Sequence, residues 1–341
     1  MPEARLEGAA APLAISLGDP AGVGPELLAE AWAQRETSRL TPFFVVGGAE
    51  LIAAAAAKRG LAVPIQRIDH PQQATAIFAH ALPVLGALDG NYRPGEPDLS
   101  GAELALASLT TAMQLVVSGG ASGLVTGPIA KARLAEAGFT HPGQTEFVAD
   151  ACGIAASDAV MMLAGPSLRA VPLTVHVALA EVPGLLTSAL IEHRAMIVAA
   201  ALTRDFGIAA PHLAVAALNP HAGEDGRMGD EDRAIIAPAV AALQAAGVDA
   251  TGPHSADALF APHLRATYDA AICMYHDQAL IPVKALDFDE GVNVTLGLPV
   301  VRTSPDHGTA FDIAGTGQAS AGAMIAAIRM AGEIAARRAL A

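Results

Sequence analysis

The amino-terminal part of the chain alternates short apolar runs with segments of helical composition. The run at residues 13–17 ends at a Gly-Asp-Pro turn, and Pro25 and Glu26 then open a helix. Proline suits the first helical turn, and a carboxylate there lies near the positive end of the helix dipole. Residues 42–47 form a second apolar run, and residues 51–59 form a second helical segment. This order predicts a parallel sheet covered by helices.

The longest uncharged stretch, residues 104–130, has the length of a membrane span. It is interrupted by Ser, Thr, Gly and Pro, so we predict a helix over 101–118, a glycine turn and a buried strand over 123–127, and no membrane partner. A loop is expected at 86–97, which contains three glycines and two prolines. Further along, strands are predicted at 160–163, 171–177, 213–218 and 270–275, and helices at 182–201, 230–246 and 319–340.

The balance of charge excludes some classes of partner. The chain has 34 Asp and Glu against 20 Lys and Arg, a formal net charge of −14, which argues against nucleic acid or an anionic membrane surface. Cys152 and Cys273 provide neither a disulfide framework nor a metal-binding pair, and are typical of a reducing cytosol. The first eleven residues contain Glu3 and Glu7 and no apolar core, so no signal peptide is expected and the predicted location is cytoplasmic.

Three histidines each follow or end a predicted strand: His176, His221 and His276. A single histidine in such a place is more often structural, but three of them at strand ends favour a divalent metal. Three protein ligands that leave further coordination positions open are typical of a catalytic metal. The candidate site therefore lies beyond the carboxyl ends of the strands, where ligands collect in open α/β sheets.

Polar side chains downstream could hold an anion. Lys284, Asn293 and Arg302 occur at nine-residue intervals in an apolar, glycine-rich setting. The glycine-rich turn at 18–26 could also bind an anion, or could be a turn without a ligand. It is neither a dinucleotide fingerprint nor a P-loop, so a nicotinamide cofactor would have to bind in another way. The loop at 306–315 could likewise be a simple connector.

Six motifs, in order, carry a resemblance over about residues 13–319. They are Gly-Asp-Pro-Ala-Gly-Val-Gly-Pro-Glu at 18–26, Thr-Gly-Pro-Ile-Ala-Lys at 126–131, Gly-Gln-Thr-Glu at 143–146, Asn-Pro-His-Ala-Gly-Glu at 219–224, Met-Tyr-His-Asp-Gln at 274–278 and Asp-His-Gly-Thr-Ala at 306–310. Together they resemble the 4-hydroxythreonine-4-phosphate dehydrogenase family. Residues 307–315 are also similar to the adenosine-binding loop of isopropylmalate dehydrogenases.

The resemblance implies an isocitrate/isopropylmalate dehydrogenase-like fold of two α/β/α domains with an active-site cleft between them. One domain would comprise residues 1–128 with 255–341 on the cofactor side, and the other residues 129–254 with the dimer contacts. It implies NAD or NADP as cofactor. The residues expected to contact it are His307, Gly308, Thr309, Ala310 and Asp312.

The resemblance also assigns roles at the substrate end. It implies that the three histidines hold zinc, magnesium or cobalt, with ligands from both subunits of a homodimer. The expected contacts of a phosphorylated hydroxy-amino-acid are Gln144, Thr145, Lys284, Asn293 and Arg302. Gln144 stands where the family usually has histidine. Lys284 is also the candidate for proton transfer, and Asp277 for support of the metal.

The implied reaction oxidises 4-phosphohydroxy-L-threonine to a 3-keto acid that loses CO2, in the synthesis of vitamin B6. Three alternatives stay open. The first is a related enzyme acting on D-threonate 4-phosphate or a cis-dihydrodiol carboxylate. The second is a non-catalytic phosphosugar-binding protein, and the third is an acyl transferase like phosphate acetyltransferase.

Overall fold

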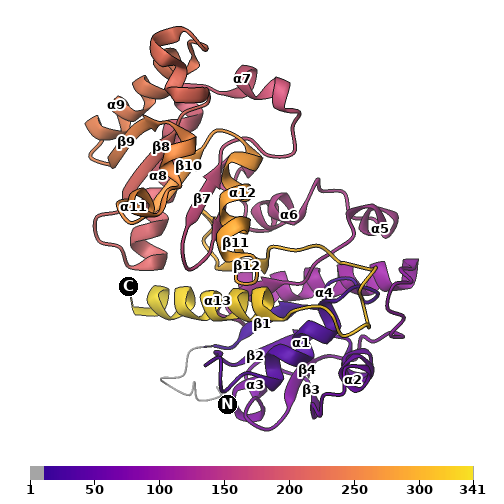
Figure 1. The fold of residues 1–341 in the computed structure, drawn as a ribbon. Helices are drawn as coiled ribbons and strands as arrows, with labels where there is room; N and C mark the ends of the chain where they lie inside the picture. The colour runs from indigo at the N-terminus through magenta and orange to yellow at the C-terminus, as the bar shows by residue number, and fades with distance from the viewer. Residues whose placement is uncertain (1–10, 341) are drawn as a thin grey trace. The chain divides into compact units, whose positions relative to one another are not determined.

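The computed structural model describes residues 11–340, which form two compact units (Figure 1). Unit 1 comprises the described residues up to Cys152 and those from Val300 onward, and unit 2 comprises residues 153–299. The expected boundaries after residues 128 and 254 fall inside these units, because residues 129–152 pack within unit 1 and residues 255–299 within unit 2. Residues 1–10, on which the expectation about a signal peptide mostly rests, lie outside the described residues.

Unit 1 is built on parallel strands in the order β3-β4-β2-β1-β5-β12. The strands are β1 (Leu13–Ser16), β2 (Phe43–Val46), β3 (Ile65–Ile68), β4 (Leu82–Leu85), β5 (Leu124–Thr126) and β12 (Arg302–Pro305). Every residue of β1 and β2 is buried, as expected for short apolar runs between helical layers. The predicted parallel, helix-covered architecture is confirmed for this unit.

The helices of unit 1 fall into two groups that pack on these strands. They are α1 (Gly24–Ala33), α2 (Ala49–Lys58), α3 (Gln73–Ile77), α4 (Leu99–Val117), α5 (Lys131–Glu136), α6 (Gln144–Ala151) and α13 (Gly322–Leu340). Helix α1 contacts α2 and α13, whereas α4 contacts α5 and α6. Pro25 and Glu26 lie in the first turn of α1, as predicted.

The uncharged stretch at 104–130 forms the predicted helix, glycine turn and strand, as α4, Gly119 with Gly120, and β5. By length and composition α4 could cross a membrane, and the bent segments Leu179–Leu185 and Ser188–Phe206 pass the same test together; the core helix of a soluble protein passes it too. Within unit 1, α4 buries Ala105 and Leu109 in a core cluster.

Unit 2 has a mixed sheet in the order β11-β6-β7-β10-β8-β9. Its strands are β6 (Val160–Ala164), β7 (Arg169–Pro172), β8 (His212–Ala216), β9 (Asp249–His254), β10 (Ala270–Cys273) and β11 (Val292–Leu296). The neighbours β7, β10, β8 and β9 run parallel, while β6 is antiparallel to both β7 and β11. The α/β class therefore holds in this unit as well.

The helical segments of unit 2 are mostly short. They are η1 (Ala156–Asp158), η2 (Leu179–Glu181), α7 (Val182–Leu185), α8 (Ser188–Phe206), η3 (Pro220–Gly226), η4 (Asp232–Ile236), α9 (Ala237–Ala245), α10 (Ala256–Leu259), α11 (Pro262–Arg265) and α12 (His276–Asp287). Helix α12 packs against β6, β7 and β10. Its buried face, with Ala279 and Val283 one turn apart, joins fully buried Cys273 in a core cluster. That cysteine thus behaves as the small apolar residue expected.

One predicted strand is too long. Residues 171–177 were expected to be extended, but β7 ends at Pro172. The chain then bends, and His176 has a φ of 53°, in the left-handed region that a β-strand cannot accommodate. Sequence periodicity overlooked this change because Leu173 and Val177 are as apolar as the strand itself.

A buried hydroxyl connects three elements of unit 1. The Ser108 Oγ of α4 accepts a hydrogen bond from the Leu17 N–H at 2.9 Å and donates to the Val46 carbonyl at 2.7 Å. Ser108 is fully buried. It therefore satisfies backbone groups at the ends of β1 and β2 that no water can reach.

We expect Ser108→Ala to lower the free energy of unfolding by about 1–3 kcal/mol, because it leaves a buried N–H without a partner. Urea unfolding followed by circular dichroism would measure the change. Ser118→Ala is the matched control, since the Ser118 hydroxyl donates to Leu115 at the exposed end of the same helix. Equal effects of the two substitutions would contradict this role of Ser108.

Candidate active site

The three predicted metal ligands follow three neighbouring strands of unit 2. His176 comes after β7, His276 after β10 and His221 after β8. Because β10 pairs in parallel with both β7 and β8, the carboxyl ends of all three strands lie at one edge of the sheet. Figure 1 shows β7, β8 and β10 in this arrangement, with α12 leaving the same edge. This edge is where open α/β sheets bind their ligands.

Hydrogen bonds from two side chains join the loops at this edge. Thr174 Oγ1 donates to the Met274 carbonyl at 2.8 Å, which connects the loop after β7 to the loop after β10. Gln278 Oε1 accepts from the Met274 N–H, and its Nε2 donates to the Ala217 carbonyl, both at 2.7 Å. The buried amide of Gln278 thus fixes the start of α12 against the end of β8. It therefore holds the turn that carries His276.

A buried carboxylate holds the loop that leads to His221. Asp232 accepts hydrogen bonds from the Leu218 N–H at 2.7 Å and from the Asn219 N–H at 3.2 Å. The Asn219 side-chain amide also donates to Asp232 at 3.0 Å. Sequence analysis overlooked Asp232, Thr174 and the role of Gln278. Of these, Gln278 alone lay in a motif that had been singled out.

The structure brings two of the three histidines together. The ring centroids of His176 and His276 are 5.8 Å apart, with the rings inclined at 42°. Asp277 Oδ1 lies 2.7 Å from His276 Nδ1, which leaves the other ring nitrogen of His276 for another partner. This donor chemistry fits a divalent cation. Among residues 11–340, no group of three His, Cys, Asp or Glu side chains is close enough to hold a metal by itself.

His221 lies in a turn of unusual backbone conformation. Residues 221–225 all have φ between 42° and 77°, a left-handed run that includes four non-glycine residues. Such a conformation costs free energy at each non-glycine residue and is concentrated at functional sites.

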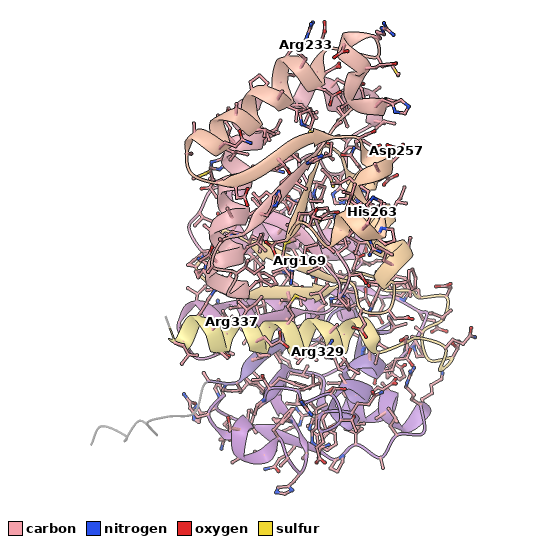
Figure 2. The ribbon with its side chains drawn as sticks, turned by 60° about the vertical axis from the view of Figure 1, so that its left-hand side comes forward. Arg169, Arg233, Asp257, His263, Arg329 and Arg337 are labelled. Atoms are coloured by element: carbon pink, nitrogen blue, oxygen red, sulfur yellow. The ribbon has the colours of Figure 1, made fainter. Side chains whose placement is uncertain are left out.

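The hydrogen bond from Ser255 and, to a smaller extent, the nearby His221 lower the pKa of Asp257, which Figure 2 labels on α10.

Two predicted substrate contacts also lie in unit 2. Lys284 is an exposed residue of α12. Asn293 lies in β11 opposite Leu163, and its Oδ1 is buried with no hydrogen-bond partner among the described residues. An orphaned buried acceptor is rare in a folded protein and is typical of a site that a ligand completes.

The remaining predicted substrate contacts lie together in unit 1. Arg302 Nη2 donates to Thr126 Oγ1 at 2.8 Å and to Gln144 Oε1 at 2.9 Å, and Gln144 Nε2 donates to the Gly127 carbonyl at 3.2 Å. Burial lowers the pKa of Arg302 to about 10, opposed by the charge of Glu146, so the guanidinium remains protonated at neutral pH. Thr145 follows Gln144 in the first turn of α6. A buried guanidinium beside a helix amino terminus is suited to an anion.

The predicted cofactor loop packs against the glycine-rich turn. The Val23 N–H donates to the Thr309 carbonyl at 2.9 Å. A β-carbon on Gly22 would lie 2.7 Å from that carbonyl oxygen, so the two backbones approach this closely only because residue 22 is glycine. Downstream, Glu26 accepts from the Gly315 N–H at 3.2 Å, and His307 Nε2 is buried with no partner among the described residues.

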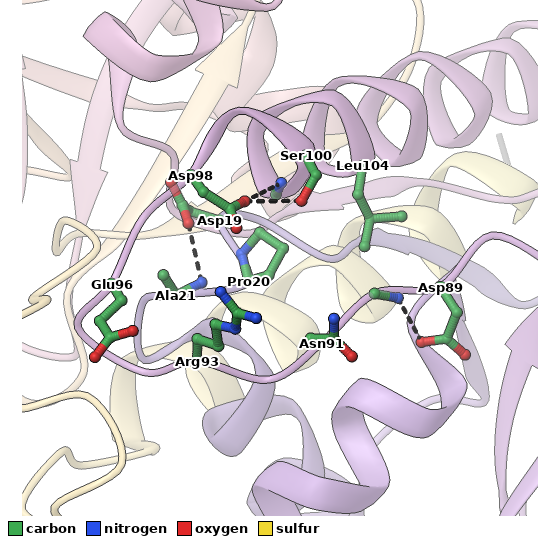
Figure 3. Close-up of a pocket in the computed structure, with 12 residues that line it drawn as sticks. Asp19, Pro20, Ala21, Asp89, Asn91, Arg93, Glu96, Asp98, Ser100 and Leu104 are labelled. Carbon is green, nitrogen blue, oxygen red and sulfur yellow. Dashed lines mark hydrogen bonds between the residues drawn. The ribbon is translucent and has the colours of Figure 1, made fainter.

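A cavity of about 190 Å³ is lined in part by the same turn (Figure 3). Its lining includes Asp19, Arg93, Glu96 and Asp98. Asp19 is almost fully buried; its Oδ1 accepts from the Ala21 N–H at 3.0 Å, while its Oδ2 has no partner among the described residues. Burial, helped by the charge of Asp98, raises the pKa of Asp19. The glycine-rich turn therefore contributes a buried carboxylate to this cavity and also contacts the predicted cofactor loop.

The fold and these side chains define an α/β protein with imidazoles after strand ends in unit 2 and a buried guanidinium in unit 1. A family model described as "Pyridoxal phosphate biosynthetic protein PdxA" matches residues 39–331, and the chain belongs to this family.

Three relatives illustrate the range of similar proteins. A 4-hydroxythreonine-4-phosphate dehydrogenase of Erythrobacter litoralis is 65% identical over 96% of this chain and 98% of its own. The solved structure of the enzyme with this name from Klebsiella pneumoniae has a TM-score of 0.83 at 37% identity, covering 96% of this chain and 99% of the other. A terephthalate 1,2-cis-dihydrodiol dehydrogenase from Burkholderia xenovorans has a TM-score of 0.63 at 29% identity, covering 95% and 99%. The chain is thus an enzyme of a dehydrogenase family, which implies a nicotinamide cofactor.

We expect Gln278→Leu to lower the free energy of unfolding by about 2–4 kcal/mol, because it leaves the Met274 N–H and the Ala217 carbonyl unsatisfied in the interior. Urea unfolding would measure this change. Gln244→Leu is the matched control in unit 2, since the exposed Gln244 makes one hydrogen bond to the Ala250 carbonyl. A loss no larger than that of the control would show that the amide does not join the two loops.

Proposed function

We propose that this protein is a 4-hydroxythreonine-4-phosphate dehydrogenase. It would oxidise 4-phosphohydroxy-L-threonine to a 3-keto acid, which loses CO2 to give 3-amino-2-oxopropyl phosphate, a precursor of vitamin B6. The observation that carries the proposal is that His176, His221 and His276 follow three neighbouring strands whose carboxyl ends share one edge of the sheet, in a chain 65% identical to a relative of that name.

The histidines are proposed to hold a divalent metal such as zinc, magnesium or cobalt. The contact between His176 and His276, with Asp277 on one ring nitrogen of His276, supports this assignment. We propose that the complete ligand set comes from both subunits of a homodimer, with residues 129–254 supplying dimer contacts. When bound, the metal would polarise the reacting hydroxyl and stabilise the negative charge left by loss of CO2.

The substrate phosphate is proposed to bind Arg302, Thr145 and Gln144. The buried Arg302 guanidinium supplies fixed positive charge, and the start of α6 adds backbone N–H groups. Asn293, whose Oδ1 lacks a partner among the described residues, would accept a hydrogen bond from the substrate. Lys284 Nζ would contact an anionic oxygen and transfer the proton that the reaction releases or returns.

The loop at 306–315 is proposed to hold NAD or NADP, which accepts hydride from the substrate. The residues expected to contact it are His307, Gly308, Thr309, Ala310 and Asp312. The buried, unpartnered His307 Nε2 and the close packing of Thr309 on Gly22 support a preformed binding surface. A preformed loop of this kind removes the need for a dinucleotide fingerprint.

A related activity has one specific observation in its favour. The 29%-identical terephthalate 1,2-cis-dihydrodiol dehydrogenase covers nearly the whole chain, so this fold also occurs in an enzyme named for an unphosphorylated substrate. Gln144, among the proposed substrate contacts, is the residue most able to alter the choice of substrate. Oxidation of D-threonate 4-phosphate or a cis-dihydrodiol carboxylate in preference to 4-phosphohydroxy-L-threonine would establish that alternative.

We expect His276→Ala to lower kcat/KM for 4-phosphohydroxy-L-threonine by at least about 100-fold, since even groups that only support a metal ligand are worth 10–100-fold. A chelator should abolish wild-type activity, and added metal should restore it. The assay follows the absorbance of the reduced nicotinamide.

The matched control for this experiment is His263→Ala, on an exposed position of α11 in the same unit (Figure 2). It should retain wild-type activity. Full activity of His276→Ala, or wild-type activity that the chelator does not affect, would contradict the proposed metal site. Neither result would alter the assignment of the chain to its family.

We expect Gln144→His to retain activity at pH 8 but to raise KM as pH falls through about 6.5, the ordinary pKa of histidine. Glutamine accepts from Arg302 at every pH, whereas a protonated imidazole cannot accept and repels the guanidinium. Steady-state kinetics from pH 6 to 8 would measure the change. Gln114→His, on the exposed face of α4, is the control, and identical KM profiles for the two variants would refute this role of Gln144.

A further inference from the structure

A long connection in unit 1 carries the loop that is proposed to bind the cofactor. Residues 306–321 join β12 to α13 and contain no helix or strand. Figure 1 shows this connection as a loop that passes beside α1. A connection of this length without secondary structure loses much conformational entropy when it is ordered, so neighbouring elements must hold it in place.

Charged side chains of two helices hold the backbone of this connection. Glu26 Oε1 accepts a hydrogen bond from the Gly315 N–H at 3.2 Å. Arg59 Nη2 donates to the Ala319 carbonyl at 2.6 Å. Glu26 lies in the first turn of α1, and Arg59 directly follows the last residue of α2. The second half of the connection is therefore fixed at two points by side chains that lie far from it in the sequence.

These two side chains also hold each other. Arg59 Nη1 lies 3.2 Å from Glu26 Oε2, and Arg59 Nη2 also pairs with Glu30 Oε2. The side chain of Glu26 is 1% exposed and that of Arg59 is 12% exposed. An ion pair shielded from water keeps more of its attraction than an exposed pair. The carboxylates of α1 thus orient the guanidinium that holds the Ala319 carbonyl.

The surroundings of this ion pair are closely packed. Gly315 has a φ of 69°, and a β-carbon there would lie 2.7 Å from Pro94 Cγ, so the connection approaches this closely only as glycine. Tyr92 lies near both charges: burial and the charge of Glu26, opposed by Arg59, raise its pKa to about 12. Its phenol is therefore neutral at physiological pH, and it adds no charge that would compete for the guanidinium.

We propose that Arg59 and Glu26 are positioning residues for the nicotinamide cofactor, which act by holding residues 306–321 in the conformation that binds it. This inference rests on the cofactor loop proposed above at 306–315. A loop that is ordered beforehand loses less entropy when a ligand binds, so the affinity is higher. Loss of the ion pair should weaken cofactor binding but have little effect on the rate at saturation, because the bound cofactor orders the loop again.

Two measurements test the proposal: fluorescence titration with NADH and NADPH, and hydrogen exchange of the full-length protein without cofactor. Arg59→Gln should raise the Kd of the reduced cofactor and the KM of the oxidised one by roughly tenfold, because charge-assisted contacts are lost. The kcat at saturating cofactor and the KM for 4-phosphohydroxy-L-threonine should stay close to the wild-type values. Amide exchange over residues 306–321 should be faster than in the wild type.

Arg35→Gln is the matched control in the same unit. The Arg35 side chain is 14% exposed and donates to the Trp32 and Ala79 carbonyls, outside the cofactor connection. The control removes similar contacts, so its cofactor Kd and its exchange over residues 306–321 should match those of the wild type. A Kd raised equally by both substitutions would indicate a general structural effect and would overturn the proposal.

A second variant keeps the test decisive if Arg59→Gln does not fold. Glu26→Gln keeps an acceptor for the Gly315 N–H but removes the charge that holds Arg59, so it should also raise the Kd. Arg59→Lys, which keeps the positive charge, should recover part of the affinity lost in Arg59→Gln. Unchanged Kd and exchange in both glutamine variants would overturn this inference alone. A wild type that binds neither NADH nor NADPH would refute the proposed function and this inference together.

Discussion

The parallel pairing of β10 with β7 on one side and β8 on the other is the constraint on which the site depends. Ala271 is in register with Ala170 and with Ala214, so the three strands end at nearly the same level. Small residues at these positions allow α12 to pack closely against the sheet. Without this register, histidines separated by 45 and 55 residues would have no reason to approach one another.

Much of this arrangement could be predicted because buried parallel strands are continuous apolar runs. Several of the elements overlooked have sequences that do not follow that pattern, although the buried apolar run of β4, Leu82–Leu85, was overlooked as well. Strand β12 begins with the buried Arg302, and β3 includes the exposed Gln66 and Arg67. Helix α12 was overlooked because its first residues, His276 and Asp277, are polar and were interpreted as site residues rather than as the start of a helix. Hydrophobic periodicity detects side chains that pack in the core, whereas these elements carry polar or exposed side chains.

The conformation of the histidine loops could not be predicted at all. His176 and His221 both have left-handed backbones, at φ 53° and 52°, although neither is a glycine. No local sequence preference selects this conformation, which the fold imposes through contacts distant in sequence. Thr174 to Met274 and Gln278 to Ala217 are such contacts. The positions of the three histidines after neighbouring strands could therefore be predicted, but the geometry of their loops could not.

The buried Arg302 is a residue that the sequence singles out and whose surroundings only the structure explains. A guanidinium removed from water needs partners that compensate its lost hydration. Thr126 and Gln144 supply neutral acceptors for Nη2, and the negative charge of Glu146 also acts on the guanidinium. A carboxylate in place of Gln144 would neutralise the charge and weaken the attraction for a phosphate. If Arg302 binds the substrate phosphate as proposed, a neutral partner weakens that attraction less than a carboxylate would, and glutamine stays neutral at every pH.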